Sequence, residues 1–233
     1  MEKRTVLTVP IEFDRGDFFS LLSLSVGAAI ARQKKFGEVI GENGWNVDPK
    51  NRVIKFGERE FGCGIIGLES ETDNTWLWGW AHTESGLPEN AAAPSRRAKR
   101  ALGGCEEFTA AKYGLDELHN GHNLSMVTVC AAVKNVCYYR CPYPGGALFV
   151  QIEDLPENIF EPLPLDALAR QFIEIIRSFY CDHKLLAAGL IHMNGFDFSE
   201  EPDSIICEQG GRILRFDFEE TGGLFATANI SLN

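Results

Sequence analysis

The first hydrophobic pattern in the chain has the spacing of an α-helix. Phe18, Leu21 and further apolar residues recur at intervals of three or four positions, and Asp17 is a suitable N-cap. This pattern predicts a helix over about residues 17–39. Glycine and alanine dominate residues 27–31, which makes this part of the helix slim and lets another element approach closely.

From residue 45 onward the hydrophobic period changes to two, which is typical of β-strands. Short polar turns separate the runs, as in a meander of antiparallel strands. Strands are predicted over residues 52–56, 61–68, 75–81, 138–141, 147–152, 205–207, 213–218 and 224–232. Further helices are predicted over about residues 95–113, with an interruption at Gly103-Gly104, and over residues 125–136 and 165–192.

The order of these elements predicts the fold class. Strands come in runs between helices rather than in strict alternation, which indicates an α+β fold with a mainly antiparallel sheet packed by several helices. Hydrophobic residues make up 45% and charged residues 24% of the chain, as in ordinary globular proteins. We expect a single α+β domain over residues 1–233, with a possible subdivision in the proline-broken acidic linker at 153–164.

The net charge of −11, from 33 acids against 22 Lys and Arg, bears on the partners. Such a chain repels phosphate groups, so we expect neither a nucleic acid nor an anionic membrane as partner. The simplest interpretation of the charge is solubility. A more specific hypothesis is a basic protein partner, bound by the acids of the linker: Glu153, Asp154, Glu157 and Glu161.

The cysteines indicate the compartment. There are seven, an odd number, and several lie in apolar contexts, such as Cys130 within Val-Thr-Val-Cys-Ala-Ala. Buried free thiols in a reducing compartment fit this pattern better than a disulfide framework. The expected location is therefore the cytoplasm.

The most distinctive segment is Thr75-Trp76-Leu77-Trp78-Gly79-Trp80-Ala81-His82. If the strand is regular, the three tryptophans project to one face. One interpretation is a sheet core covered by helices. The other is the aromatic wall of a ligand pocket, with His82 at the end of the strand.

The segment Thr-Trp-Leu-Trp-Gly-Trp-Ala resembles the signature of an uncharacterised bacterial domain family with a Thr-Trp-Leu-Trp-x-Trp-Ala-Asn core. Tyr139-Arg140-Cys141-Pro142 is similar to that family's Tyr-Arg-x-Pro turn, and residues 215–222 resemble its closing strands. His82 replaces the usual Asn. The family has no established activity, so the resemblance implies no catalytic residue. The candidate ligand-binding residues are Trp76, Trp78, Trp80, His82, Tyr139 and Arg140.

Other chemistry has little support. His119 and His122, like Cys137 and Cys141, lack the paired spacing of structural zinc ligands, so no metal site is predicted. No nucleophile or phosphate-loop signature is present, and no cofactor is expected. Four cations within residues 96–100 form either a solvated face paired with nearby acids or a patch that contacts an anion.

These observations favour a non-enzymatic binding module, for example an acidic inhibitor-type protein for a basic partner. The alternative is a small-ligand-binding domain or an enzyme with a pocket along the Trp strand. A pocket that touches Trp78, Trp80, His82 and Arg140 would favour the alternative, whereas a packed sheet with a flat acidic patch would favour the first hypothesis.

Overall fold

The computed structural model describes residues 4–82, 86–132 and 134–233, and position 133 of the predicted helix over 125–136 lies outside these residues. Five α-helices occur in the described chain: α1 (Phe18–Ile40), α2 (Ala93–Ala101), α3 (Gly121–Ala131), α4 (Leu165–Ser178) and α5 (His183–Met193). The strands are β1 (Trp45–Asp48), β2 (Val53–Phe56), β3 (Arg59–Ser70), β4 (Thr75–Trp78), β5 (Lys112–Gly114), β6 (Cys137–Tyr143), β7 (Gly146–Ile152), β8 (Ser199–Glu201), β9 (Ser204–Gln209), β10 (Arg212–Thr221) and β11 (Leu224–Leu232).

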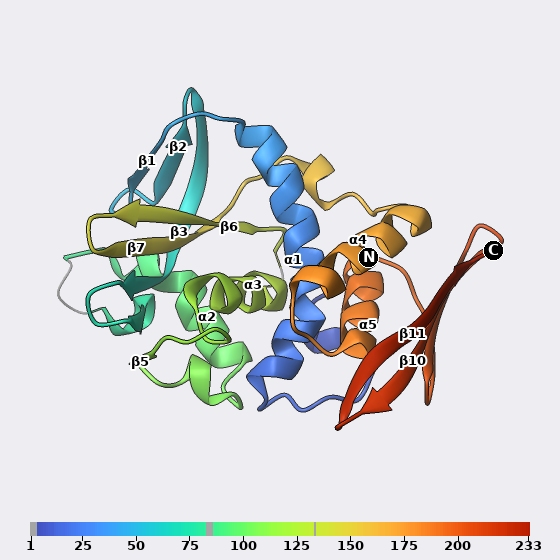
Figure 1. The fold of residues 1–233 in the computed structure, drawn as a ribbon. Helices are drawn as coiled ribbons and strands as arrows, with labels where there is room; N and C mark the ends of the chain where they lie inside the picture. Colours follow the sequence, from blue (N-terminus) through green and yellow to red (C-terminus); the bar gives the residue numbers. More distant parts are fainter. Residues whose placement is uncertain (1–3, 83–85, 133) are drawn as a thin grey trace.

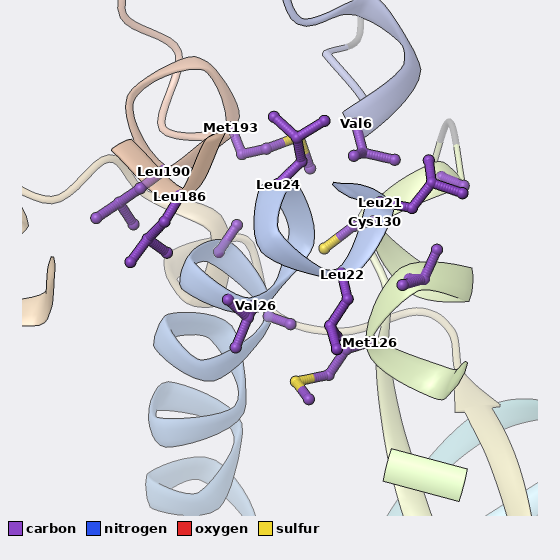
Figure 2. Close-up of a cluster of buried hydrophobic side chains, with 14 of the residues drawn as sticks. Val6, Leu21, Leu22, Leu24, Val26, Met126, Cys130, Leu186, Leu190 and Met193 are labelled. Carbon is purple, nitrogen blue, oxygen red and sulfur yellow. The ribbon is translucent and has the colours of Figure 1, made fainter. Parts of the chain in front are cut away.

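The predicted first helix is confirmed as α1, which lies between the two halves of the fold (Figure 1). The Asp17 carboxylate accepts the backbone N–H groups of Phe19 and Ser20, which caps the helix. Helix α5 packs directly on α1, so closely that a Cβ at Gly189 would lie 2.0 Å from the carbonyl oxygen of Leu24. In the slim stretch, a Cβ at Gly27 would lie 3.1 Å from the Cβ of Leu190 on α5, so the close approach is the expected one. Figure 2 shows leucines of α1 pointing toward side chains of α3 and α5.

The first sheet has seven strands, and all of their pairings are antiparallel. Strands β1 to β5 follow one another in order, while β7 pairs with the other edge of the long strand β3 and carries β6. In Figure 1 this sheet lies on the left, with α3 between it and α1. The predicted α+β fold with a mainly antiparallel sheet is confirmed.

The second sheet has the order β11-β10-β9-β8 and is also antiparallel. Helices α4 and α5 cover one face of it, where the rings of Phe172 and Phe216 lie 4.6 Å apart between centroids. The other face carries the partly exposed side chains of Arg215 and Asp217. This sheet lies on the right in Figure 1, on the far side of α1 from the first.

Three predicted elements differ from the structure. The single helix over 165–192 is wrong, because the chain leaves helical geometry after Ser178 and Asp182 caps a new helix. The helix over 95–113 ends at Ala101, since Gly103 and Gly104 follow, and its predicted end forms β5. The helix predicted from Ser125 begins at Gly121, because the Asn120 side chain accepts the N–H of Asn123.

All seven cysteines are buried free thiols, as the sequence predicts. Among the described residues, no helix has both the length and the apolar character needed to cross a membrane.

Candidate functional site

The Trp segment is partly a strand and mostly core. Trp76 and Trp78 lie on β4, are fully buried, and their rings meet edge to face with centroids 5.3 Å apart. Gly67 on β3 makes this possible, because a Cβ there would lie 2.2 Å from the Trp76 ring. The Trp78 indole N–H donates to the carbonyl oxygen of Glu107 at 2.7 Å. Of the two interpretations, this geometry fits the sheet core, because both rings are completely buried against other side chains.

Trp80 does not share that face, so the expectation of three tryptophans on one regular strand is wrong. The chain turns into a 3₁₀ helix at Gly79–Ala81, which takes Trp80 off the strand. Its ring is half-buried, with the Lys99 ammonium 3.4 Å from the ring centroid. His82 follows, partly buried, and its Nδ1 has no hydrogen-bond partner in the described chain.

Tyr139 and Arg140 point to different surroundings. The Tyr139 ring packs edge to face on Phe56, 4.8 Å between centroids, in a hydrophobic cluster separate from that of the tryptophans. Arg140 forms ion pairs with Glu69 at 3.6 Å and Glu71 at 3.2 Å. The six residues predicted to bind a ligand therefore do not converge on one place in the described structure.

The acidic linker is divided between a partly buried ion-pair cluster and exposed acids. Glu153 accepts from Arg52 at 3.1 Å and from Arg97 at 3.4 Å, and its side chain is only 12% exposed. The expectation that Glu153 belongs to a free acidic surface is thus wrong, because two guanidinium groups already neutralise it. Asp154, Glu157 and Glu161 are exposed.

A pocket of about 540 Å³ opens where three distant segments meet. We call it the Tyr180 pocket. The start of α1 forms one side, the loop that leads into α3 forms the second, and the α4–α5 connection forms the third. Its lining residues are Phe19, Leu22, Glu117, Leu118, Asn120, His122, Asn123, Ser178, Phe179 and Tyr180.

The aromatic side of the pocket is open to solvent. Tyr180 is 76% exposed, an unusual state for a large aromatic side chain. Its ring lies 5.3 Å from that of Phe19 between centroids. Because α4 ends at Ser178 and Asp182 caps α5, residues 179–181 form a short non-helical link that presents this ring.

The polar side of the pocket is fixed by hydrogen bonds. The Asn123 side-chain amide donates to the carbonyl oxygen of Leu118 at 2.8 Å, which holds the loop against α3. The Nδ1 atom of His122 lies 3.1 Å from the hydroxyl of Tyr138. Burial lowers the pKa of His122, Arg140 lowers it further, and Glu69 opposes the shift, which favours a neutral ring at physiological pH.

His119, Glu107 and Asp116 form a hydrogen-bonded network next to the same loop. His119 lies between two carboxylates, with Nε2 3.1 Å from Glu107 and Nδ1 3.0 Å from Asp116. The hydrogen bond from His119 lowers the pKa of Asp116, which keeps that carboxylate ionised. The Cys105 thiol donates to Glu107 at 2.9 Å. The His119 ring also packs on Phe18, 5.2 Å between centroids, so the network ties the loop to α1.

The buried cysteines are poor nucleophiles at neutral pH. Burial raises the pKa of the Cys63, Cys137, Cys141 and Cys181 thiols to about 12, so thiolates are scarce at neutral pH. In the described part of the chain, no three His, Cys, Asp or Glu side chains are grouped so that they could hold a metal ion. The Tyr180 pocket instead combines aromatic rings, amides and one carboxylate, and its described lining contains neither Lys nor Arg.

Sequence reasoning found the loop of this site but not its aromatic side. His119 and His122 were considered only as metal ligands, and Phe19, Phe179 and Tyr180 were placed inside helices. The one available signal was Asp182, a residue with high N-cap preference in the middle of a predicted helix. A cap at that position would have exposed residues 178–181 as a connection.

Comparison with known proteins gives one match. Searches of curated proteins and of solved structures found no similar chain. A family model described as "Family of unknown function (DUF6882)" matches residues 20–155. The matched residues include the Trp segment and residues 139–142, whereas 215–222 lie outside. Since more than half of the 233 residues are matched, the chain belongs to this family of unknown function.

Proposed function

We propose that the protein is a binding module for a basic protein partner, and that one cationic side chain of the partner enters the Tyr180 pocket. The observation that carries the proposal is the composition of the pocket. An exposed aromatic ring and a carboxylate, Tyr180 and Glu117, line one cavity in a chain of net charge −11.

The chemistry of the pocket selects for a cation. A Lys or Arg group over the face of an aromatic ring gains about 0.5–2 kcal/mol, depending on how far it is desolvated. Glu117 adds a Coulomb attraction, and the described lining offers no cation to compete for it. The neutral state favoured for His122 avoids a positive charge next to the site.

The size of the pocket fits a side chain with part of its backbone. Ligand pockets typically measure about 300–1,000 Å³, and the value of about 540 Å³ lies within that range. On the polar side, the side-chain N–H groups of Asn120 and Asn123 donate to the carbonyl oxygens of Glu117 and Leu118, which holds the wall of the pocket in place for a ligand.

The exposed acids of the linker contribute to the approach of the partner. Asp154, Glu157 and Glu161 remain solvated, and such charges raise association rates more than affinity. Their effect decreases as salt screens them, with a Debye length of about 8 Å at physiological ionic strength.

The experiment measures binding of short blocked peptides by NMR titration. Acetyl-Gly-Arg-Gly-amide should bind, and the citrulline peptide, which has the same shape without the charge, should bind much more weakly. Tyr180→Ala should reduce the affinity several-fold. Tyr143→Ala is the matched control, because Tyr143 is also an exposed tyrosine, 43% accessible, but lies on the β6–β7 hairpin.

Two variants that each remove one negative charge distinguish direct contact with the peptide from long-range electrostatic attraction. Glu117→Gln should weaken binding of the Arg peptide at every salt concentration, whereas Glu157→Gln should change only the salt-dependent part. In a pull-down from the native host, the partner recovered should be basic. Equal binding of the Arg and citrulline peptides, or indifference to both Tyr180→Ala and Glu117→Gln, would refute the proposal.

A further inference from the structure

A second cavity lies on another side of the molecule, between α2 and the end of α3. We call it the α2 cavity. Its volume is about 290 Å³, close to the lower end of the range for small-molecule pockets. Its lining residues are Pro94, Arg97, Ala98, Arg100, Ala101, Thr128, Ala131, Ala132 and Gln151. None of them belongs to the Tyr180 pocket.

The cavity exists because two helices face each other with small side chains. Ala98 and Ala101 on α2 and Ala131 and Ala132 at the end of α3 all line the space between the two helices. These methyl groups provide an apolar floor. An apolar floor alone does not define a ligand, and the polar groups at the rim supply the specificity.

The cationic side chains of α2 make different contacts, which the sequence alone could not show. Lys99 lies over the ring of Trp80, and Arg97 is paired with Glu153. Arg100 is exposed, lines the cavity, and makes no ion pair within the described residues. One free guanidinium group therefore stands at the mouth of the cavity, in a protein that is otherwise acidic.

The buried side-chain amide of Gln151 lines the α2 cavity. Gln151 on β7 is 1% exposed, and its side-chain N–H donates to Glu153 at 3.0 Å. Since the nitrogen donates to that carboxylate, Oε1 is the atom of the Gln151 side chain that can accept a hydrogen bond from a molecule in the cavity.

We propose that the α2 cavity binds a small organic carboxylate that also carries a hydroxyl or amide N–H group. The carboxylate pairs with Arg100 at the mouth, the hydroxyl or N–H group donates to the Gln151 oxygen, and the apolar body covers the alanine floor. Arg97 remains held by Glu153, which in turn is held by Arg52, so this side of the rim is rigid before the ligand arrives. This site is independent of the proposed partner-binding pocket.

Three probes of similar size test the chemistry by saturation-transfer NMR on the full chain. They are 3-hydroxybutyrate, which has both groups, butyrate, which lacks the hydroxyl, and 1,3-butanediol, which lacks the carboxylate. The expected order of affinity is 3-hydroxybutyrate, then butyrate, with no measurable transfer to the diol. No transfer to 3-hydroxybutyrate at millimolar concentration would overturn the proposal.

Two variants locate the binding, and one serves as control. Arg100→Gln should weaken binding of 3-hydroxybutyrate about tenfold, the usual effect of losing a charged hydrogen bond. Ala101→Leu should block the cavity from a solvent-exposed position, so the fold should tolerate it. Arg177→Gln is matched to the first, because Arg177 is also an exposed arginine in the last turn of a helix.

The outcome is read together with a melting curve of each variant. Loss of binding in Arg100→Gln and Ala101→Leu, with unchanged melting and with full binding in Arg177→Gln, supports the α2 cavity. Binding that survives both variants would overturn the assignment. Selectivity among the probes, measured on the wild-type chain, tests the proposal even if a variant fails to fold.

Discussion

The two sheets of this protein are stabilised in different ways. In the first sheet, Trp76 and Trp78 are completely buried and pack on each other and on neighbouring rings. In the second sheet, only the face toward α4 and α5 is covered, and Ile213 on β10 remains 39% exposed. The first sheet therefore depends on side-chain burial, whereas the second needs further contacts to stay in place.

Those contacts are concentrated at the start of α5. The Asp182 backbone N–H donates to the Ser23 hydroxyl of α1 at 3.0 Å. The Asp182 carboxylate accepts the N–H groups of Leu185 at 2.8 Å and Phe225 at 2.9 Å. The family match ends at residue 155, so the second sheet lies outside it. Besides the hydrophobic packing of this sheet on α4 and α5, the hydrogen bonds of Asp182 link it to the matched helix α1. The comparison teaches that a polar residue can add a direct link between a sheet and a core that is otherwise built by hydrophobic packing.

The largest effect is expected from the first sheet. Trp78→Ala removes a fully buried indole and its hydrogen bond to Glu107, and truncation of a large buried aromatic side chain typically costs about 3–5 kcal/mol. The unfolding midpoint in urea should therefore decrease markedly. Phe225→Ala, a partly exposed ring of the second sheet, should lower it much less. Equal effects of the two substitutions would contradict the distinction between the sheets.

The sequence predicted the packed elements well, and the breaks between them poorly. The helix from Asp17 and the strands around β3 and β7 are set by local periodicity, which a single sequence displays. The break after Ser178 interrupts a continuous apolar pattern, and only the cap at Asp182 marks it. Strand β4 ends at Trp78 because the chain bends at Gly79, although the Trp alternation continues.

The candidate sites were harder to predict because they depend on tertiary contacts. The Tyr180 pocket joins residues near positions 20, 120 and 180, and the α2 cavity joins α2, α3 and β7. The spacing of residues within one segment carries no information on which distant segments come into contact. Glu153 illustrates the same limit, since its acidic neighbourhood in the sequence conceals two arginines that approach it in space.

The second expected effect is a pH dependence of the unfolding free energy that arises from His192 in α5. Burial lowers the pKa of His192 from 6.5 to about 4, and nearby Arg4 contributes. Between these values the unfolded chain binds more protons than the native chain, so stability decreases as pH falls from 6.5 toward 4. Each pKa unit corresponds to about 1.4 kcal/mol, so the loss amounts to at most about 3.5 kcal/mol. Above pH 6.5 this contribution is constant.

A substitution of His192 tests whether this residue causes the pH dependence of the unfolding free energy. His192→Gln should flatten the pH dependence of the unfolding free energy between pH 6.5 and 4. His122→Gln, at a histidine of the first half whose pKa is also lowered, should leave most of the slope. If the slope is the same in His192→Gln as in wild type, the acid sensitivity does not arise in α5.

The smallest of the three effects tests the connection itself. Asp182→Ala removes the cap of α5 and leaves the Phe225 N–H without its acceptor, and together these losses should cost about 2 kcal/mol. The loss should be local before it is global, because the hydrogen bonds between β10 and β11 remain. Hydrogen exchange should therefore accelerate first at the amide of Phe225, while amides of β3 keep their protection. Asp17→Ala is the matched control, since Asp17 caps α1 with the same chemistry but has no strand to hold. If both variants accelerate exchange at Phe225 equally, the second sheet is held by helix stability in general and not by the Asp182 contact.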